Sequence, residues 1–272
     1  MSKERGIVSV HIEKTGGTSI EKFYKAFFGP DRVLLYNANL DTVLRSSENY
    51  LSRTNPLVDV FKYQLGKCPF LFFFNKLRIL TQKYHPGQNP ANGLPENFTI
   101  VHGHFGASRF DSQILDPIMA VVIRDPLDRM MSQFNHWKRA RGRVEWRKKL
   151  PFNPTVSFED FCLMPELKNY QLQALEGKDL SEFELVGVTE LLERFARGIV
   201  ICARENKLVD STLPRRYCGI DKLNVSPYSG LGVGKKFKEK FKGTHLDDYE
   251  LYRQAVDIAF MLDKRTQTEE HF

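Results

Sequence analysis

The sequence has few cysteines, and they are scattered. The 272 residues include four cysteines, with no Cys-x-x-Cys pair among them. This spacing, with no histidine at zinc-ligand spacing, argues against a structural zinc site and against a disulfide framework. We expect buried thiols in a reducing compartment at all four positions. They are Cys68, Cys162, Cys202 and Cys218.

The chain also lacks an obvious segment for export or membrane insertion. Its longest apolar run, Cys68–Phe74, is far shorter than the ~20 residues that a membrane-spanning helix needs. The polar start Met1–Arg5 leads straight into a strand pattern and not into the core of a signal peptide. We therefore expect a cytoplasmic protein without a transmembrane segment.

Charge of one sign is in modest excess. Forty Lys and Arg residues against 33 Asp and Glu give a formal net charge of +7. This favours anionic partners such as phosphates, nucleic acid, acidic glycans or a lipid surface, although solubility alone explains it equally well. The hydrophobic fraction of 42% suffices for a substantial core. We expect one domain over residues 1–272.

Strand-like and helix-like segments alternate along the chain. Apolar runs predict buried strands at 7–12, 98–101, 119–123 and 184–188. Helical spacing predicts helices from about residue 20 to Gly29, from Pro126 onward, over 191–203 and from about Asp247. This alternation predicts an α/β fold of three layers, with a mostly parallel central sheet flanked by helices.

Two segments have no clear period. Residues 31–95 are expected to form irregular helices, as an acceptor-side insert or lid. Residues 226–242 are rich in Gly and Lys and are expected to form a loop.

The first predicted strand runs into the segment His11-Ile12-Glu13-Lys14-Thr15-Gly16-Gly17-Thr18-Ser19, which opens a helix. Such a turn binds anions, because glycines let the backbone approach and the helix N-terminus favours negative charge. Lys14 adds a positive charge, and the hydroxyls of the turn add donors. The lysine precedes the glycines, unlike in the Walker A motif, which disfavours a kinase or nucleotide triphosphatase. An ordinary capped turn is the alternative.

Two further segments carry groups suited to phosphate binding and proton transfer. In Val122-Ile123-Arg124-Asp125-Pro126-Leu127-Asp128-Arg129-Met130-Met131-Ser132, Arg124 follows a strand and its planar guanidinium can pair with phosphate oxygens. In Val101-His102-Gly103-His104-Phe105, a strand-like backbone directs both imidazoles to one side. An imidazole that titrates near neutrality is a suitable general base. We find no third ligand for a metal and expect none.

The three segments together resemble the sulfotransferase family that includes heparan sulfate 2-O-sulfotransferase and its bacterial relatives. The similarity covers most of residues 7–260 and is strong only in these blocks. It implies a P-loop-like sulfotransferase fold and 3′-phosphoadenosine 5′-phosphosulfate (PAPS) as sulfate donor. It also implies His104 as catalytic base, His102 as its helper and Lys14 as a catalytic cation. The implied donor-binding residues are Lys14, Thr15, Gly16, Gly17, Thr18, Ser19, Arg124 and Ser132, the last two for the 3′-phosphate.

Some residues depart from this pattern or have no role in it. The family usually has Pro before the lysine, where this chain has Glu13, and a carboxylate there weakens anion binding unless it points away. Arg129 belongs to the pattern and fits a structural salt bridge as well as a ligand contact. We expect His11, His85 and His136 to be structural.

The resemblance implies in-line transfer of a sulfuryl group from PAPS to a hydroxyl of a carbohydrate, in a glycan or glycolipid. A different hypothesis is a nucleic-acid or polyanion binding module that uses the basic stretch Lys138–Lys149 with Trp137 and Trp146. We favour a solvated helix end for that stretch and expect no nucleic-acid partner. A P-loop-like kinase is the third hypothesis.

Overall fold

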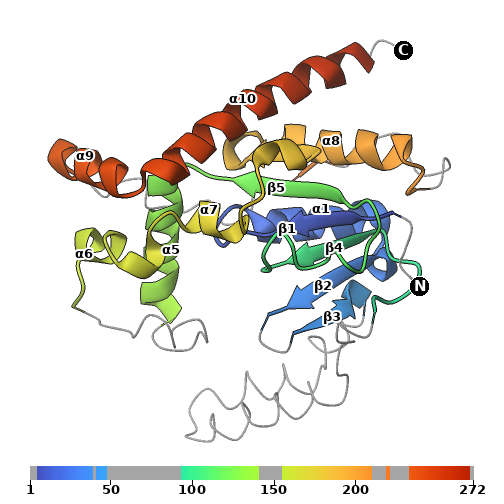
Figure 1. Ribbon diagram of the computed structural model, residues 1–272, viewed down its shortest axis with the longest axis horizontal. Helices are drawn as coiled ribbons and strands as arrows, with labels where there is room; N and C mark the ends of the chain where they lie inside the picture. Colours follow the sequence, from blue (N-terminus) through green and yellow to red (C-terminus); the bar gives the residue numbers. More distant parts are fainter. Residues whose placement is uncertain are drawn as a thin grey trace, which may run out of the picture.

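A computed structural model describes residues 5–38, 41–47, 93–140, 155–209, 219–220 and 233–269. Within these residues six strands form one sheet in the order β3-β2-β4-β1-β5-β6 (Figure 1). All neighbours pair in parallel except β2 and β3, which are antiparallel. The strands are β1 (Ile7–Val10), β2 (Val33–Asn37), β3 (Thr42–Arg45), β4 (Ile100–Gly103), β5 (Ile118–Ile123) and β6 (Leu185–Val188).

Helices cover both faces of this sheet. Apolar side chains of α1 (Gly17–Phe28) and α8 (Leu192–Glu205) pack on one face. The other face is covered by α10 (Leu246–Glu269) and by the turns of residues 105–114. Two buried layers of side chains thus enclose the strands, as expected for an α/β fold.

A third apolar cluster lies outside the sheet. It joins α5 (Pro126–Ala140), α6 (Phe158–Cys162) and α9 (Lys235–Thr244), with Trp137, Phe161 and Phe241 fully buried in it. In Figure 1 these helices lie beyond the ends of the strand arrows. The short helices between the main elements are η1 (Pro30–Arg32), η4 (Pro165–Leu167), α7 (Tyr170–Ala174), η5 (Leu180–Glu182) and η6 (Thr189–Leu191).

The strand order places the candidate motifs at one edge of the sheet. β1 is central, between β4 and β5, and all three run in the same direction. The segments that follow Val10, Gly103 and Ile123 therefore begin at the same carboxyl edge. In open α/β sheets, ligands bind at this edge, where connections leave in opposite directions.

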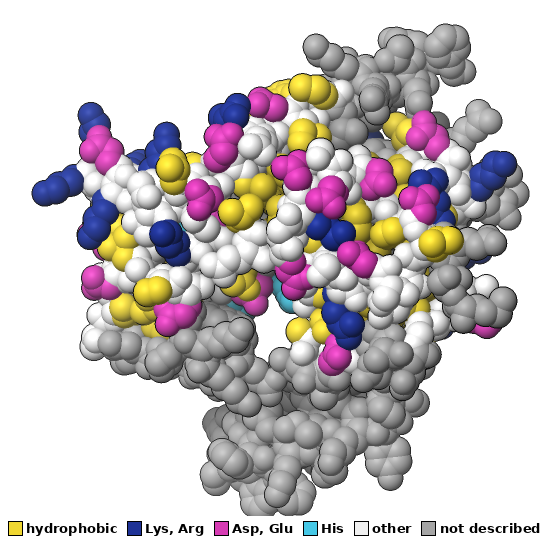
Figure 2. Space-filling model, in the orientation of Figure 1, with side chains coloured by type: hydrophobic (Ala, Val, Ile, Leu, Met, Phe, Trp, Pro, Cys, Tyr) yellow, Lys and Arg dark blue, Asp and Glu magenta, His cyan; other side chains and the backbone are white. Residues whose placement is uncertain are grey.

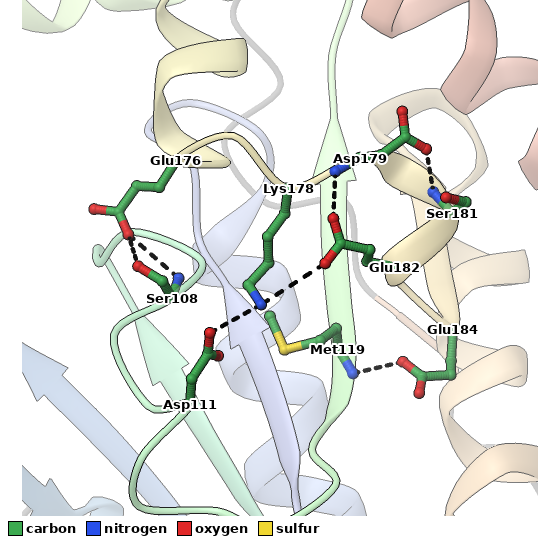
Figure 3. Close-up of polar contacts among 9 residues, drawn as sticks. All are labelled: Ser108, Asp111, Met119, Glu176, Lys178, Asp179, Ser181, Glu182 and Glu184. Atoms are coloured by element: carbon green, nitrogen blue, oxygen red, sulfur yellow. Dashed lines mark hydrogen bonds and ion pairs between the residues drawn. The ribbon is translucent and has the colours of Figure 1, made fainter.

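Polar side chains hold the connection between α7 and β6 (Figure 3). The Glu176 carboxylate accepts a hydrogen bond from the Ser108 backbone amide at 3.2 Å and another from its hydroxyl. Lys178 Nζ lies 3.0 Å from the Asp111 carboxylate. A capping box closes η5 directly afterwards. These contacts fasten the segment after β4 to the turn before β6.

Most predicted elements are confirmed, including β1, β5, β6, α1, α5, α8 and α10, but some predictions were wrong. Residues 33–37 and 42–45 are strands of the central sheet and not irregular helices. α9 forms within the predicted loop, because Phe237 and Phe241 lie one turn apart and are both buried. β4 begins at Ile100 and includes His102, so this histidine lies within the strand. Residues 51–92, which hold most of the expected insert, lie outside the described residues.

Two cysteines lie in the described part of the chain. Cys162 is buried, Cys202 is half-buried, and both are free thiols. Burial raises the pKa of each thiol. The predicted burial is confirmed for Cys162 but not for Cys202, whereas Cys68 and Cys218 lie outside the described residues. Among the helices that are described, none has the length and apolar character to span a membrane.

Candidate functional site

The turn between β1 and α1 contains two residues with left-handed backbone conformation. The φ angle is 72° at Lys14 and 91° at Gly16. Such a φ costs a residue other than glycine about 1–2 kcal/mol, so the surroundings must hold Lys14 in place. The buried Thr15 hydroxyl donates to the Ile12 carbonyl oxygen at 2.8 Å. Thr15 thus closes the turn from inside.

α1 directs its N-terminus at this turn. Its N-cap is Gly16, and among the described residues no side chain caps it and no acidic residue lies in its first turn. Thr18 is exposed, whereas Ser19 is buried. The first-turn amides and the helix dipole give this end a partial positive charge. The end of α1 together with Lys14 therefore favours an anion.

Arg124 follows β5 and reaches the same turn. Its Nη1 donates to the Lys14 carbonyl oxygen at 3.1 Å. The buried Gln171 of α7 holds the backbone of Arg124, donating to its carbonyl oxygen at 2.9 Å and accepting from its amide at 3.0 Å. Arg124 therefore joins the ends of β1 and β5 and helps hold Lys14 in its unfavourable conformation.

The helix α7, which holds the backbone of Arg124, is itself held by α10. The Asp248 carboxylate, 1% exposed, accepts from the amide of Gln171 at 3.3 Å and from that of Leu172 at 2.9 Å. These bonds cap the start of α7. Burial raises the pKa of Asp248. A continuous path of hydrogen bonds thus runs from Asp248 through Gln171 and Arg124 to the Lys14 carbonyl.

The ammonium group of Lys14 has cationic neighbours. Burial is the main cause that lowers its pKa, and the guanidinium groups of Arg139 and Arg124 lower it further. Glu13 opposes these effects and raises the pKa. An oxyanion would relieve the repulsion between these cations. The structure thus brings together Lys14 and Arg124, two of the predicted site residues, and adds Arg139 from the end of α5.

Glu13, the residue that departs from the family pattern, is bound to α5. Its Oε2 accepts from Gln133 Nε2 at 3.0 Å, and Gln133 is 2% exposed. The carboxylate is therefore anchored to a buried side chain. This contact connects the turn after β1 to α5.

His104 is exposed just beyond the end of β4. Its Nδ1 lies 2.8 Å from the His11 carbonyl oxygen. A carbonyl oxygen only accepts hydrogen bonds, so Nδ1 carries the hydrogen and donates. In the neutral ring, Nε2 is then the basic nitrogen. His104 therefore has the tautomer that a general base at Nε2 requires.

His102 is buried in the sheet and not at the surface. It is 3% exposed and pairs in register with Ser9 of β1. Its Nδ1 lies 3.0 Å from Ser9 Oγ, which is itself 2.9 Å from the Tyr24 hydroxyl of α1. Burial lowers the pKa of His102 to about 4. Any helper role of His102 is therefore exerted through neighbouring groups.

His11, expected to be structural, lies in contact with both other histidines. Its ring stacks on that of His104 at 4.1 Å and on that of His102 at 5.1 Å between centroids. The sequence singled out only the pair on β4. One sequence feature could have identified His11. It directly follows β1, the strand that pairs with β4.

Arg129 is 1% exposed and lies over the Tyr170 ring, with its Cζ 4.8 Å from the ring centroid. Its guanidinium nitrogens have no hydrogen-bond partner among the described residues. Burial lowers its pKa, against the attraction of Asp248, Tyr170 and Glu13. Within the described part of the chain, Arg129 forms a cation–π contact and not the salt bridge that was one of its two predicted roles.

Two carboxylates lie near Arg124, and Ser132 lies farther along the chain on α5. Ser132 is half-buried on α5, which begins two residues after Arg124. Asp125 and Glu190 lie close enough to Arg124 that the guanidinium opposes the rise in their pKa caused by burial. The positive charge of Arg124 is thus partly balanced by acidic neighbours.

The described residues contain no group of three or more His, Cys, Asp and Glu side chains arranged to hold a metal ion. Neither a scan against models of protein families nor a search of curated proteins found a match to this chain. The site itself must therefore support any functional assignment.

Proposed function

We propose that this chain is a PAPS-dependent sulfotransferase that acts on a hydroxyl of a carbohydrate, in a glycan or glycolipid. The observation that carries the proposal is the meeting of three groups at one sheet edge. Lys14 with the N-terminus of α1 forms an anion-binding turn, Arg124 approaches it from β5, and His104 stands exposed after β4. The central position of β1, followed by this turn and α1, also supports a P-loop-like fold.

The residues at the turn fit the two anionic groups of the donor. The first-turn amides of α1 and the ammonium of Lys14 would hold the 5′-phosphosulfate. Arg124 would bind the 3′-phosphate together with Ser132. Its contact with the Lys14 carbonyl uses one N–H of five, so a fork of donors remains for phosphate oxygens.

The bound donor supplies the sulfuryl group and a phosphate leaving group. His104 Nε2 takes the proton of the acceptor hydroxyl as the hydroxyl oxygen forms its bond to sulfur and the bond from sulfur to the phosphate oxygen breaks. Lys14 and the amides of α1 stabilise the negative charge that develops on the departing oxygen. His104 ends the step as an imidazolium and releases its proton to solvent.

Transfer of radiolabelled sulfate from PAPS to a panel of glycans, glycolipids and small alcohols tests the proposal. His104→Ala should lower transfer about 10²–10⁴-fold, the usual contribution of a general base. Its affinity for adenosine 3′,5′-bisphosphate, measured by calorimetry, should change less than about twofold because the donor site is intact. Full activity of this variant would show that His104 is not the base.

The donor site is tested separately by Lys14→Ala and Arg124→Ala. Each should weaken binding of adenosine 3′,5′-bisphosphate about tenfold or more, because a charge-assisted hydrogen bond contributes about 1.5–3 kcal/mol. Lys22→Ala and Arg253→Ala are matched controls, since both side chains are exposed on helix surfaces away from the turn. Unchanged calorimetric affinity in both site variants would rule out this donor site.

A polyanion-binding module is the second candidate, and α9 favours it. This helix carries five exposed lysines and one exposed glutamate, and Figure 2 shows Lys and Arg side chains gathered at the α9 end of the molecule. The lysines are Lys235, Lys236, Lys238, Lys240 and Lys242. RNA binding that weakens steeply with salt, without any binding of PAPS, would favour this function over the enzyme. The stretch 141–149 lies outside the described residues.

Magnesium-dependent ATP turnover that does not respond to PAPS would instead support the kinase hypothesis.

A further inference from the structure

His11 contacts His104 in two ways. Its carbonyl oxygen accepts the hydrogen bond from His104 Nδ1 at 2.8 Å, and its ring stacks on the His104 ring at a centroid distance of 4.1 Å and an interplanar angle of 26°. The hydrogen bond fixes one nitrogen, and the stack restricts the plane of the ring. Together these contacts determine where Nε2 of His104 points.

The position of His11 is itself constrained. Its amide donates to the Gly103 carbonyl oxygen at 2.9 Å, which continues the pairing of β1 with β4. On the helix side, a Cβ added to Gly17 would lie 1.8 Å from the His11 ring. The ring thus lies against the first residue of α1, where only glycine leaves room for it. The His11 side chain thus contacts both the anion-binding turn and the His104 ring.

The charge of the His11 ring affects proton uptake by His104. Burial lowers the pKa of His11 well below its ordinary value, and His104, His102 and Lys14 lower it further. His11 is therefore neutral near pH 7. A cationic ring at this distance would oppose proton uptake by His104, whereas a neutral aromatic ring does not.

We propose that His11 is a positioning residue for His104, holding the Nδ1–H tautomer through its carbonyl and the orientation of the ring through the stack. This inference rests on the proposed function, because it assigns His11 to the same proton transfer. It gives a role to a residue that belongs to neither the predicted base pair nor the predicted anion contacts.

Two substitutions test the stack, since both leave the backbone carbonyl of residue 11 in place. His11→Phe keeps a flat ring without nitrogens, and His11→Ala removes the stack. We expect kcat to fall at least tenfold in His11→Ala and less than about threefold in His11→Phe, with the affinity for adenosine 3′,5′-bisphosphate within twofold in both. An unchanged kcat in His11→Ala, or an equal loss in His11→Phe, would overturn the proposal.

A second measurement does not depend on activity. Nitrogen-15 chemical shifts of the His104 ring report which nitrogen carries the hydrogen. We expect Nδ1–H in the unmodified protein and in His11→Phe. In His11→Ala we expect a mixture of tautomers, because a His104 ring without the stack can turn away from the carbonyl of residue 11. Gly17→Ala should reproduce the mixture by displacing the His11 ring, whereas Gly29→Ala, at the open far end of α1, should not.

The two kinds of failure are distinguishable. A chain without sulfate transfer in which the tautomer still depends on residue 11 would reject the proposed function and keep the contact. A chain with transfer, but with the same tautomer in all four variants, would reject the role of His11 alone.

Discussion

At the scale of single residues, the glycine between His102 and His104 is required by the neighbouring strand. A Cβ at Gly103 would lie 2.9 Å from both Cβ and the carbonyl oxygen of Tyr36 on β2. A backbone atom cannot give way as a flexible side chain does. The residue between the two histidines must therefore be glycine for β4 to pair closely with β2.

Gly103→Ala should lower the free energy of unfolding by about 1–3 kcal/mol, the usual cost of overpacking. Gly243→Ala is the matched control, because Gly243 lies in α9 with nothing within 4 Å of its added Cβ. There alanine should stabilise by about 0.5–1 kcal/mol. Urea unfolding of both variants measures the difference. Equal effects would show that the approach of Tyr36 imposes no constraint.

The sequence pointed to the strand ends that carry Lys14, Arg124 and His104, but not to the contacts that surround them. Lys14, Arg124 and His104 lie together at the sheet edge, as their order along the chain indicated. His11 was missed, because its contacts depend on the pairing of β1 with β4, which no local pattern reveals. The contact of Glu13 with Gln133 was hidden for the same reason, since 120 residues separate the two.

At the scale of elements, α10 and α7 stabilise each other's first turns. Asp248 accepts from the amides of Gln171 and Leu172, and its own amide donates to Asn169 Oδ1 at 3.4 Å. Arg124 depends on this arrangement through Gln171. A substitution that removes the Asp248 carboxylate from α10 should therefore also weaken the proposed donor site.

Asp248→Ala should lower the free energy of unfolding by about 1–3 kcal/mol, because it leaves buried amides without partners. It should also weaken binding of adenosine 3′,5′-bisphosphate. Asp257→Ala, which removes an exposed carboxylate 3.3 Å from Arg253 on the same helix, should change stability by less than about 1 kcal/mol. Denaturant unfolding and calorimetry check both expectations. Donor affinity equal to that of the unmodified protein in Asp248→Ala would contradict the coupling.

Element type was predictable where the apolar pattern was long. The apolar residues of α1 and α8 repeat at helical spacing and form the buried faces of these helices. β2 and β3 were missed because a run such as Val33-Leu34-Leu35 is too short to show a period. Its strand form depends on pairing with β4, which is distant in sequence.

At the scale of the whole molecule, the fold class followed from the alternation of strands and helices, but the strand order did not. The order β3-β2-β4-β1-β5-β6 arises from pairings between distant segments, and one of its strands reverses direction.

The same burial that makes β4 a central strand also encloses a titratable side chain, His102. Stability should therefore depend on pH.

The expected direction follows from the pKa of His102, which is about 4 in the folded state against an ordinary value of 6.5. Between these values the unfolded chain takes up a proton that the folded chain does not. The contribution is fully present above pH 6.5 and is lost as the pH falls toward 4. At pH 5 the loss is about 2 kcal/mol.

His102→Asn, which retains a hydrogen-bonding group for Ser9, should remove this part of the pH dependence. Unfolding in urea at pH 8 and at pH 5 measures it in both proteins. The carboxylates of the half-buried Asp125 and the buried Asp248, whose pKa is raised, act in the opposite direction but are common to both proteins. Equal losses in the two proteins would show that His102 does not cause the acid sensitivity.

The hydrogen-bond path from Asp248 to Lys14 has a consequence for how the chain can be divided. All three motifs lie before residue 133, so a fragment ending there holds each proposed catalytic and donor-binding residue. That fragment lacks the amide of Gln171 that holds the Arg124 backbone and the carboxylate that caps α7. The smallest fragment that can bind the proposed donor should therefore extend into α10. Two separately expressed halves should bind adenosine 3′,5′-bisphosphate in calorimetry only when they reassemble.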